Sequence, residues 1–205
     1  IDEEKMGIIL QEVCGTHYKD YFFPTFSGVA RSVNFYPIAP EKTDDGIASV
    51  AMGLGKYIVE GGMSLRFSPK YPKKVLQLST PELVLRDSKT YLYALNRNPD
   101  QFNPVPDDGV NIEKIRLRNF DDLSVLKPMA STFDFQNNIL REGTNYKGKK
   151  IITFSPILNH NVFPLADILQ DLLFVGQNEM NNPIEIEFAV NLNTPEGCPK
   201  IFNFL

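Results

Sequence analysis

A regular alternation of apolar and polar residues marks the segment "NNPIEIEFAVN", residues 181–191. Apolar residues at every second position from Ile184 to Val190 predict a β-strand, because side chains two residues apart on a strand share one face. Glu185 and Glu187 fall together on the opposite face. They point either into water on a solvated sheet surface, or into a site that binds a metal ion or accepts a proton.

The first third of the chain contains two further strand patterns. "GIILQEV", residues 7–13, is an apolar run typical of a buried strand, and "GVARSVNFY", residues 28–36, alternates like a half-buried one. The segment between them, "THYKDYFFPTFS", is rich in aromatic residues, so we expect a loop that packs or makes contacts. The glycines of "DDGIASVAMGLGKYIVEGG" predict tight turns and close backbone approach.

The middle of the chain, residues 67–160, is predicted to be a β-rich insertion. Its strand patterns are separated by Pro, Asn, Asp and Gly. The predicted strands are "KVLQLS", "TYLYALN", "NIEKIRLRN" and "KKIITF". Between the last two, "DDLSVLKPMASTFDFQNNIL" predicts a short helix followed by an irregular stretch.

The clearest helix is predicted over residues 162–177, where leucines recur at helical spacing. Pro164 suits its first turn, and Gly176 is a candidate end. The strand at 184–190 follows, then a turn at "NTPEGCP" and a last strand, "KIFNFL", which most simply form an antiparallel hairpin. The predicted fold class is therefore α+β, with a mixed or antiparallel sheet and few helices.

Composition narrows the class of protein. The chain has 205 residues, of which 42% are hydrophobic and 22% charged, as expected for a folded globular domain. Its net charge of −4 argues against non-specific nucleic-acid binding. Two cysteines without a CxxC pair predict a reducing, cytoplasmic setting, and no apolar run is long enough for a membrane span. The abrupt start and the apolar end lead us to expect part of a longer protein.

Few residues carry recognisable chemistry by themselves. Cys14 and His17 form a CxxH pair without a second pair, which favours a turn over a zinc site. "GLGK", residues 53–56, lacks the spacing of a phosphate-binding loop and is more typical of a glycine-rich turn. Glu185 and Glu187 have the stronger case, since their Cα atoms would lie ~7 Å apart on one strand face. One could bind Mg²⁺ while the other tunes it, although a solvated face stays the simpler interpretation.

Four segments together resemble the nucleotide-binding domain of the phosphoenolpyruvate synthase and pyruvate phosphate dikinase family. "GIILQEV", "FSGVARS", "GLGKYIVEG" and "IEIEFAV" follow the order of the family's V-Q-x-M-V, S-G-V-x-F-T, G-L-G-E-x-V-V-x-G and D-I-E-[WF]-A motifs. The resemblance implies an ATP-grasp-like fold, of which residues 1–205 would be the second subdomain. The first subdomain would precede Ile1.

The resemblance also implies roles for particular residues. Gln11, Glu12 and Val13 would form the strand that borders the adenine, through backbone groups. Ser27 and Gly28 would belong to a loop over the phosphates. Glu187 would help hold Mg²⁺ on the ATP, and Glu185 would stand beside it.

Several positions depart from the family pattern. "YFFPTF" replaces a glycine-rich loop, Lys56 replaces the Glu of G-L-G-E, and Arg31 with Ser32 replaces F-T. The family's final Q-x-R-P would begin after Leu205. These changes alter the expected phosphate contacts but leave Glu187 in place.

The function implied is that of an ATP-binding half-domain of a phosphotransferase. In the parent enzyme, Mg-ATP would phosphorylate a carrier histidine in a separate phosphohistidine domain, and the phosphate would pass to pyruvate; the isolated half-domain is expected to be inactive. One alternative is a non-catalytic nucleotide-sensing or interaction domain of the same fold. A remoter one is a β-rich binding domain unrelated to nucleotides.

Overall fold

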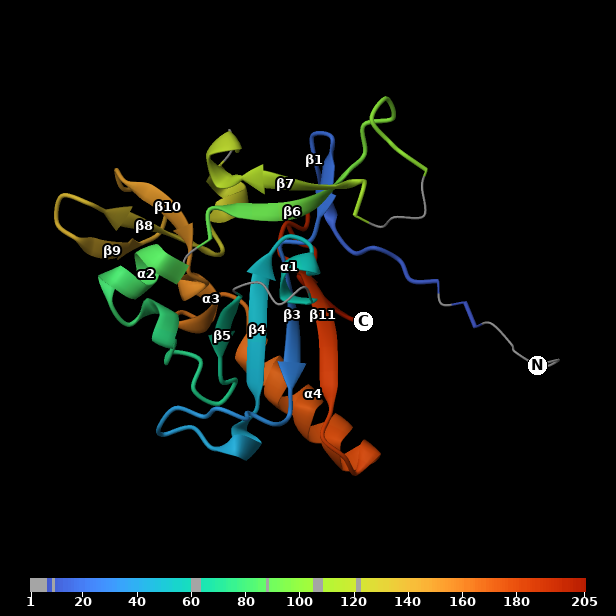
Figure 1. Ribbon diagram of the computed structural model, residues 1–205, viewed down its shortest axis with the longest axis vertical. Helices are drawn as coiled ribbons and strands as arrows, with labels where there is room; N and C mark the ends of the chain where they lie inside the picture. The colour runs from blue at the N-terminus through green and yellow to red at the C-terminus, as the bar shows by residue number, and fades with distance from the viewer. Residues whose placement is uncertain (1–6, 9, 60–63, 88, 105–108, 121–122) are drawn as a thin grey trace.

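The structure is a computed structural model in which three antiparallel sheets and one long helix share a hydrophobic core (Figure 1). It describes residues 7–8, 10–59, 64–87, 89–104, 109–120 and 123–205. The buried side chains of the main cluster extend from Phe23 to Val190 and come from all parts of the chain, including the β-rich middle. The coarse α+β class, with mostly antiparallel sheets and few helices, is confirmed.

The largest sheet has five strands in the order β12-β11-β3-β4-β5, and every neighbouring pair is antiparallel. Its strands are β3 (Phe26–Arg31), β4 (Ile47–Met52), β5 (Leu65–Phe67), β11 (Glu185–Asn191) and β12 (Ile201–Phe204). The predicted strand and the predicted C-terminal hairpin are confirmed. Exposure alternates over residues 185–188 as predicted, whereas Ala189 and Asn191, on the same face as the two glutamates, are buried. The strand expected over residues 28–36 ends earlier, at Arg31.

Helix α4 (Leu165–Met180) lies across one face of this sheet, behind β3, β4 and β11 in Figure 1. Leu165, Leu169 and Leu173 are its buried residues, as the leucine spacing predicted. Gly176 does not end the helix, which continues to a left-handed cap at Asn181 with φ of 49°. A side chain at Gly176 would overlap Ile184, so this glycine allows close approach to the chain that enters β11.

The inner face of the sheet depends on a contact between a glycine and an aromatic ring. Gly28 of β3 pairs directly with Phe188 of β11, and a Cβ atom at Gly28 would overlap the phenyl ring. The ring is buried and stacks on Phe202, with centroids 5.2 Å apart. The absence of a side chain at Gly28 is therefore a packing requirement of the core.

A second sheet has the order β1-β2-β6-β7, with β1 (Thr16–Tyr18), β2 (Tyr21–Phe23), β6 (Tyr91–Asn96) and β7 (Ile112–Arg116). Strands β6 and β7 were predicted. The aromatic segment that was expected to be a loop instead forms the β1–β2 hairpin, because its rings pack: Tyr18 and Phe23 both contact Phe120, at centroid distances of 4.8 and 6.1 Å.

A third sheet has the order β10-β8-β9, with β8 (Ala130–Asp134), β9 (Ile139–Glu142) and β10 (Lys149–Ile152). The prediction of β10 is confirmed, whereas the irregular stretch expected before it is wrong and is the β8–β9 hairpin. Four successive residues of β8 are buried, so its sequence lacks the alternation by which strands are recognised.

Short helical turns lie between the strands. They are η1 (Thr43–Asp45), α1 (Lys56–Val59), η2 (Leu76–Leu78), α2 (Pro81–Asp87), η3 (Leu117–Asn119), η4 (Leu123–Leu126) and α3 (Ser155–Leu158). The strand predicted at "KVLQLS" is wrong, since this segment forms η2. Within the described parts of the chain, no helix combines the length and apolar character needed to cross a bilayer.

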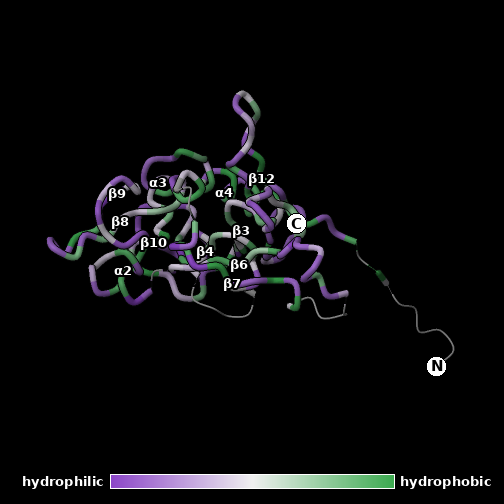
Figure 2. Tube along the Cα trace, turned by 90° about the horizontal axis from the view of Figure 1, so that it is seen from above, coloured by the Kyte–Doolittle hydropathy of each residue, from purple (hydrophilic) through white to green (hydrophobic). Residues whose placement is uncertain are grey.

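The buried strand predicted over residues 7–13 is also wrong for its described residues. They have no strand assignment and run away from the sheets toward the N-terminus (Figures 1 and 2). Ile8, Leu10 and Val13 are all exposed. An apolar run becomes a strand only when another strand hydrogen-bonds to it, and the described residues offer this one no partner.

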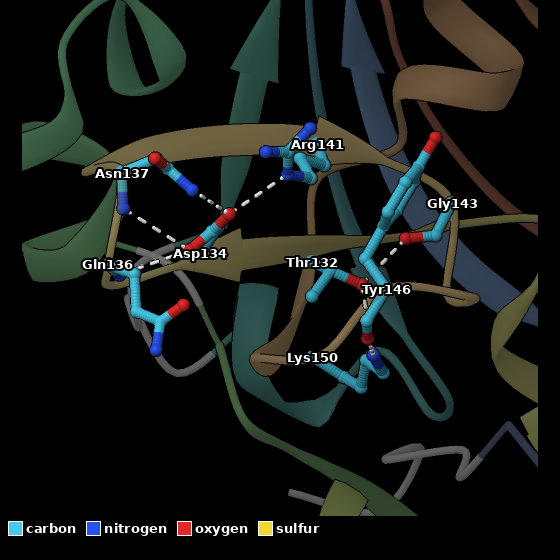
Figure 3. A network of polar contacts seen from close by, with 8 residues as sticks. All are labelled: Thr132, Asp134, Gln136, Asn137, Arg141, Gly143, Tyr146 and Lys150. Carbon is cyan, nitrogen blue, oxygen red and sulfur yellow. Dashed lines mark hydrogen bonds and ion pairs between the residues drawn. The ribbon is translucent and has the colours of Figure 1, made fainter.

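The β8–β9 hairpin is held by a network around Asp134 (Figure 3). Its carboxylate accepts hydrogen bonds from the Gln136 and Asn137 backbone N–H groups, the Asn137 side chain and the Arg141 guanidinium, at 2.8–3.3 Å. These bonds, led by those from Asn137 and Arg141, lower the pKa of Asp134 to about 2.

We predict that Gly28→Ala destabilises the fold by about 1–3 kcal/mol, because the new methyl group would overlap the Phe188 ring. Urea unfolding measures this difference. Gly55→Ala is the matched control, since its Cβ would meet the Ser27 Cβ atom at an ordinary 3.4 Å and no other atom of the described residues within 4 Å. Equal stability of the Gly28→Ala variant and the wild type would contradict the packing role of Gly28.

We predict that Asp134 contributes stability at neutral pH and loses this contribution in acid. A pKa lower in the folded than in the unfolded chain stabilises the fold above the ordinary aspartate pKa, and the effect disappears as the pH falls through about 2. The urea midpoints of wild type and Asp134→Asn should therefore differ at pH 5–7 and converge toward pH 2. Asp100→Asn, an exposed aspartate outside this network, is the matched control.

Candidate functional site

The face of the five-stranded sheet opposite α4 collects the charged residues of its strands. Because Gly28 and Phe188 point toward the core, the residues on either side of them point outward. We call this surface the outer face. It consists of Val29 and Arg31 on β3, Ile47 and Ser49 on β4, Arg66 on β5, and Glu185 and Glu187 on β11.

These side chains form two rows that cross the strands. In the first row, Glu185, Arg31 and Ile47 lie on successive strands in direct register. In the second row, Glu187, Val29, Ser49 and Arg66 do the same. The Leu205 backbone N–H donates to the Glu187 carbonyl at 3.0 Å, so the chain after β12 also runs beside the second row.

The outer face borders a hollow of about 510 Å³. Besides the outer face itself, its walls include Phe35 and Tyr36 from the loop after β3, Ile58 from α1, and Ser64. Both signs of charge and two aromatic rings therefore surround a space large enough for a small ligand.

Glu185 and Glu187 differ in their partners. The Glu185 carboxylate forms an ion pair with the Arg31 guanidinium, and the two side chains remain 46% and 54% exposed. Such an exposed pair contributes at most about 1 kcal/mol to stability. Among the described residues, the Glu187 side chain has no hydrogen-bond or ion-pair partner, although it lines the same hollow. The alternation predicted that the two carboxylates share a face, but not that only one of them is paired.

A buried serine adds hydrogen bonds that support the β3–β11 register, which places these carboxylates. Ser32 forms two hydrogen bonds with Ile184, the residue before β11. The Ser32 N–H donates to the Ile184 carbonyl at 3.0 Å, and the Ser32 Oγ accepts from the Ile184 N–H at 2.9 Å. Ser32 is only 3% exposed. It therefore holds the start of β11 against the end of β3.

The outer face offers one carboxylate that is unpaired among the described residues, which is part of what a magnesium site needs. No group of three or more His, Cys, Asp or Glu side chains that could hold a metal ion occurs among the described residues. Mg²⁺ is commonly held by one or two carboxylates, with phosphate oxygens and water completing its shell. Glu187 fits such a single-carboxylate role, while Glu185 is already engaged with Arg31.

The family resemblance placed Ser27 and Gly28 in a loop over the phosphates. In the structure both residues lie inside β3. Gly28 faces the core, and the Ser27 Oγ donates to the Gly53 carbonyl at 2.8 Å. Gly53, which has φ of 78°, therefore lies against Ser27. Its left-handed backbone is the kind of conformation that the glycine-rich segment predicted. The expected loop conformation is wrong at these residues, because β3 pairs with both β4 and β11 and uses their backbone groups. Their contact with a phosphate stays a prediction.

Gln11, Glu12 and Val13 are exposed and do not form the strand that was expected to border an adenine. None of the three is among the residues that line the described hollow. Their proposed contact with a nucleotide stays a prediction without a strand to support it.

The Cys14–His17 pair has partners other than a metal. His17 lies against Phe22, and its Nε2 is 2.9 Å from the Arg97 guanidinium. Burial, with a smaller effect of Glu12, raises the pKa of the Cys14 thiol. His17 lies within β1 and not in the turn that the sequence favoured, since it pairs with Phe22 of β2.

Phe35, Tyr36 and Arg66 were not singled out from the sequence. Phe35 and Tyr36 are 72% and 81% exposed, and they follow the fully buried Asn34, whose Oδ1 accepts from the Tyr36 N–H at 3.1 Å. The Asn34 side chain also donates to Glu41 at 3.0 Å. The sequence signal that could have pointed to Phe35 and Tyr36 is the pair of adjacent aromatic residues in "NFYP". For Arg66, the signal is the short apolar–polar alternation "LRF".

One further polar atom lies along the same side of β11. Asn191 is 7% exposed, and its Oδ1 has no hydrogen-bond partner among the described residues. It is separated from Glu187 by four residues, or ~13 Å of strand. It therefore belongs to a different part of this face.

A scan against models of known protein families, a search among curated proteins and a search among solved structures each found no match to this chain.

Proposed function

We propose that this chain is the ATP-binding half-domain of a phosphoenolpyruvate synthase-like phosphotransferase, with an ATP-grasp-like fold. The observation that carries the proposal is the Glu187 carboxylate, which faces a hollow on the outer face and has no partner among the described residues. Glu187 is also the acidic residue of the segment that resembles D-I-E-[WF]-A. The order of the four family-like segments adds to this support.

In the proposed site, Glu187 would hold Mg²⁺ on the phosphates of ATP. Neutralisation of phosphate charge is the chemistry that a bound Mg²⁺ supplies in phosphoryl transfer. Glu185 would act beside the metal ligand, by holding Arg31 in place through their ion pair. Val29 and Ile47 give the floor of the hollow an apolar surface between the charged residues. Positioning and charge complementarity are the contributions expected of such a site.

The proposed partners of this half-domain are the first ATP-grasp subdomain and a phosphohistidine domain. The outer face is the side on which a first subdomain would close over the nucleotide. In the parent enzyme, phosphate would pass from ATP to the carrier histidine and then to pyruvate.

A second candidate is a non-catalytic nucleotide-sensing or interaction domain of the same fold. The observation in its favour is that Ser27 and Gly28 lie within a strand and offer no phosphate loop. Binding of Mg-ATP without phosphoryl transfer by the longest natural form of the protein would favour this candidate over the enzyme.

We predict that Glu187→Gln weakens Mg-ATP binding at least about tenfold, because an amide is a poorer magnesium ligand than a carboxylate. Calorimetric titration of the chain, and of the full-length protein where the gene encodes more, measures the change. Glu185→Gln is the matched control and should have a smaller effect, since Glu185 is paired with Arg31.

Folding of the Glu187→Gln variant is checked by urea unfolding, where an exposed side chain should change stability by less than about 0.5 kcal/mol. Equal Mg-ATP affinity of this variant and the wild type would remove Glu187 from the site.

A further inference from the structure

Arg66 is the second arginine of the outer face, and it differs from Arg31 in having no side-chain partner among the described residues. Its side chain is exposed and lines the hollow. Arg31 is already paired with Glu185, so its charge is largely compensated. Arg66 is therefore the cation of this face that has charge to offer to a ligand.

The backbone that carries Arg66 is held on both sides. On one side, β5 pairs with β4, where Arg66 stands opposite Ser49. On the other side, the Gln77 side chain takes the place of a neighbouring strand: its Oε1 accepts from the Arg66 N–H at 2.7 Å, and its Nε2 donates to the Ser64 carbonyl at 2.8 Å. Gln77 thus closes the edge of β5 and holds the backbone from which the Arg66 side chain extends.

Arg66 and Glu187 lie in one row across the sheet. The row crosses from β11 through β3 and β4 to β5, which is three strand spacings, or ~14 Å between the two Cα atoms. Both side chains line the hollow between them. A long arginine side chain and a carboxylate-bound cation can reach the same extended anion from opposite sides of such a space.

We propose that Arg66 binds the phosphate chain of the nucleotide whose Mg²⁺ is held by Glu187. This inference rests on the function proposed above and adds a residue to it. A guanidinium presents a fork of N–H donors that matches phosphate oxygens, and charge-assisted hydrogen bonds of this kind are the stronger ones. Arg66 would thereby supply cationic contacts in a chain where "YFFPTF" replaces the glycine-rich loop of the family pattern.

The test compares three probes in calorimetric titrations: Mg-ATP, magnesium tripolyphosphate and adenosine. Arg66→Gln is expected to raise the Kd for Mg-ATP and for tripolyphosphate roughly tenfold or more, and to leave adenosine binding unchanged. The Kd values of Arg66→Lys for Mg-ATP and tripolyphosphate should lie between those of Arg66→Gln and the wild type, because lysine keeps the positive charge but lacks the forked N–H donors of the guanidinium. Arg118→Gln, an exposed arginine on the η3 turn, is the matched control and should match the wild type.

The outcomes separate the two proposals. If Glu187→Gln weakens Mg-ATP binding and Arg66→Gln does not, the role of Arg66 is wrong and the proposed function stands. If Arg66→Gln weakens adenosine as much as tripolyphosphate, Arg66 is no phosphate ligand. If the wild-type protein binds neither Mg-ATP nor tripolyphosphate, both proposals fail together. Urea midpoints of the Arg66 variants confirm that they fold.

Discussion

Burial of a single face of the five-stranded sheet under α4 determines the character of the opposite face. Once Phe188 packs over Gly28 and the leucines of α4 cover them, every second residue of β3, β4 and β11 must point away from the core. A slip of one residue would bury Glu185 and Glu187 without partners, at a large cost in free energy. The Ser32–Ile184 hydrogen bonds add a local restraint to the same register. The two carboxylates, Arg31 and Arg66 share a surface because of this constraint.

The parts of the fold that were predicted correctly have strong periodicity, and the parts that were missed depend on distant partners. The alternation of β11 and the leucine spacing of α4 report burial directly, so both elements lie close to their predicted bounds. Residues 7–13 show why an apolar run alone is insufficient, since no described strand pairs with them. In β8 a real strand was missed, because residues on both of its faces are buried and its sequence therefore lacks an apolar–polar alternation. Gly28 was interpreted as part of a phosphate loop. The structure gives a packing reason for a glycine here, because the Phe188 ring occupies the space that a Cβ atom would need.

The candidate site was predicted in part. The sequence placed two carboxylates on one face, whereas the structure distinguishes them: Glu185 is paired with Arg31, and Glu187 lines the hollow with no partner among the described residues. Arg66 and Phe35 come from segments that no periodicity connects to β11, and only strand pairing and the shared hollow bring them to it. With no match among known families, proteins or structures, the proposed function rests on the order of four family-like segments and on this surface.

The central claim is that the outer face, rather than any other surface, receives a magnesium-bound nucleotide. The most direct measurement is a two-dimensional amide NMR titration of the isotope-labelled protein with Mg-ATP. The account predicts that the largest shift changes fall on Val29, Ser49, Arg66 and Glu187, with little change in the β8–β9 hairpin. Shift changes confined to another surface, such as the hollow beside His17, or no saturable change at all, would contradict it.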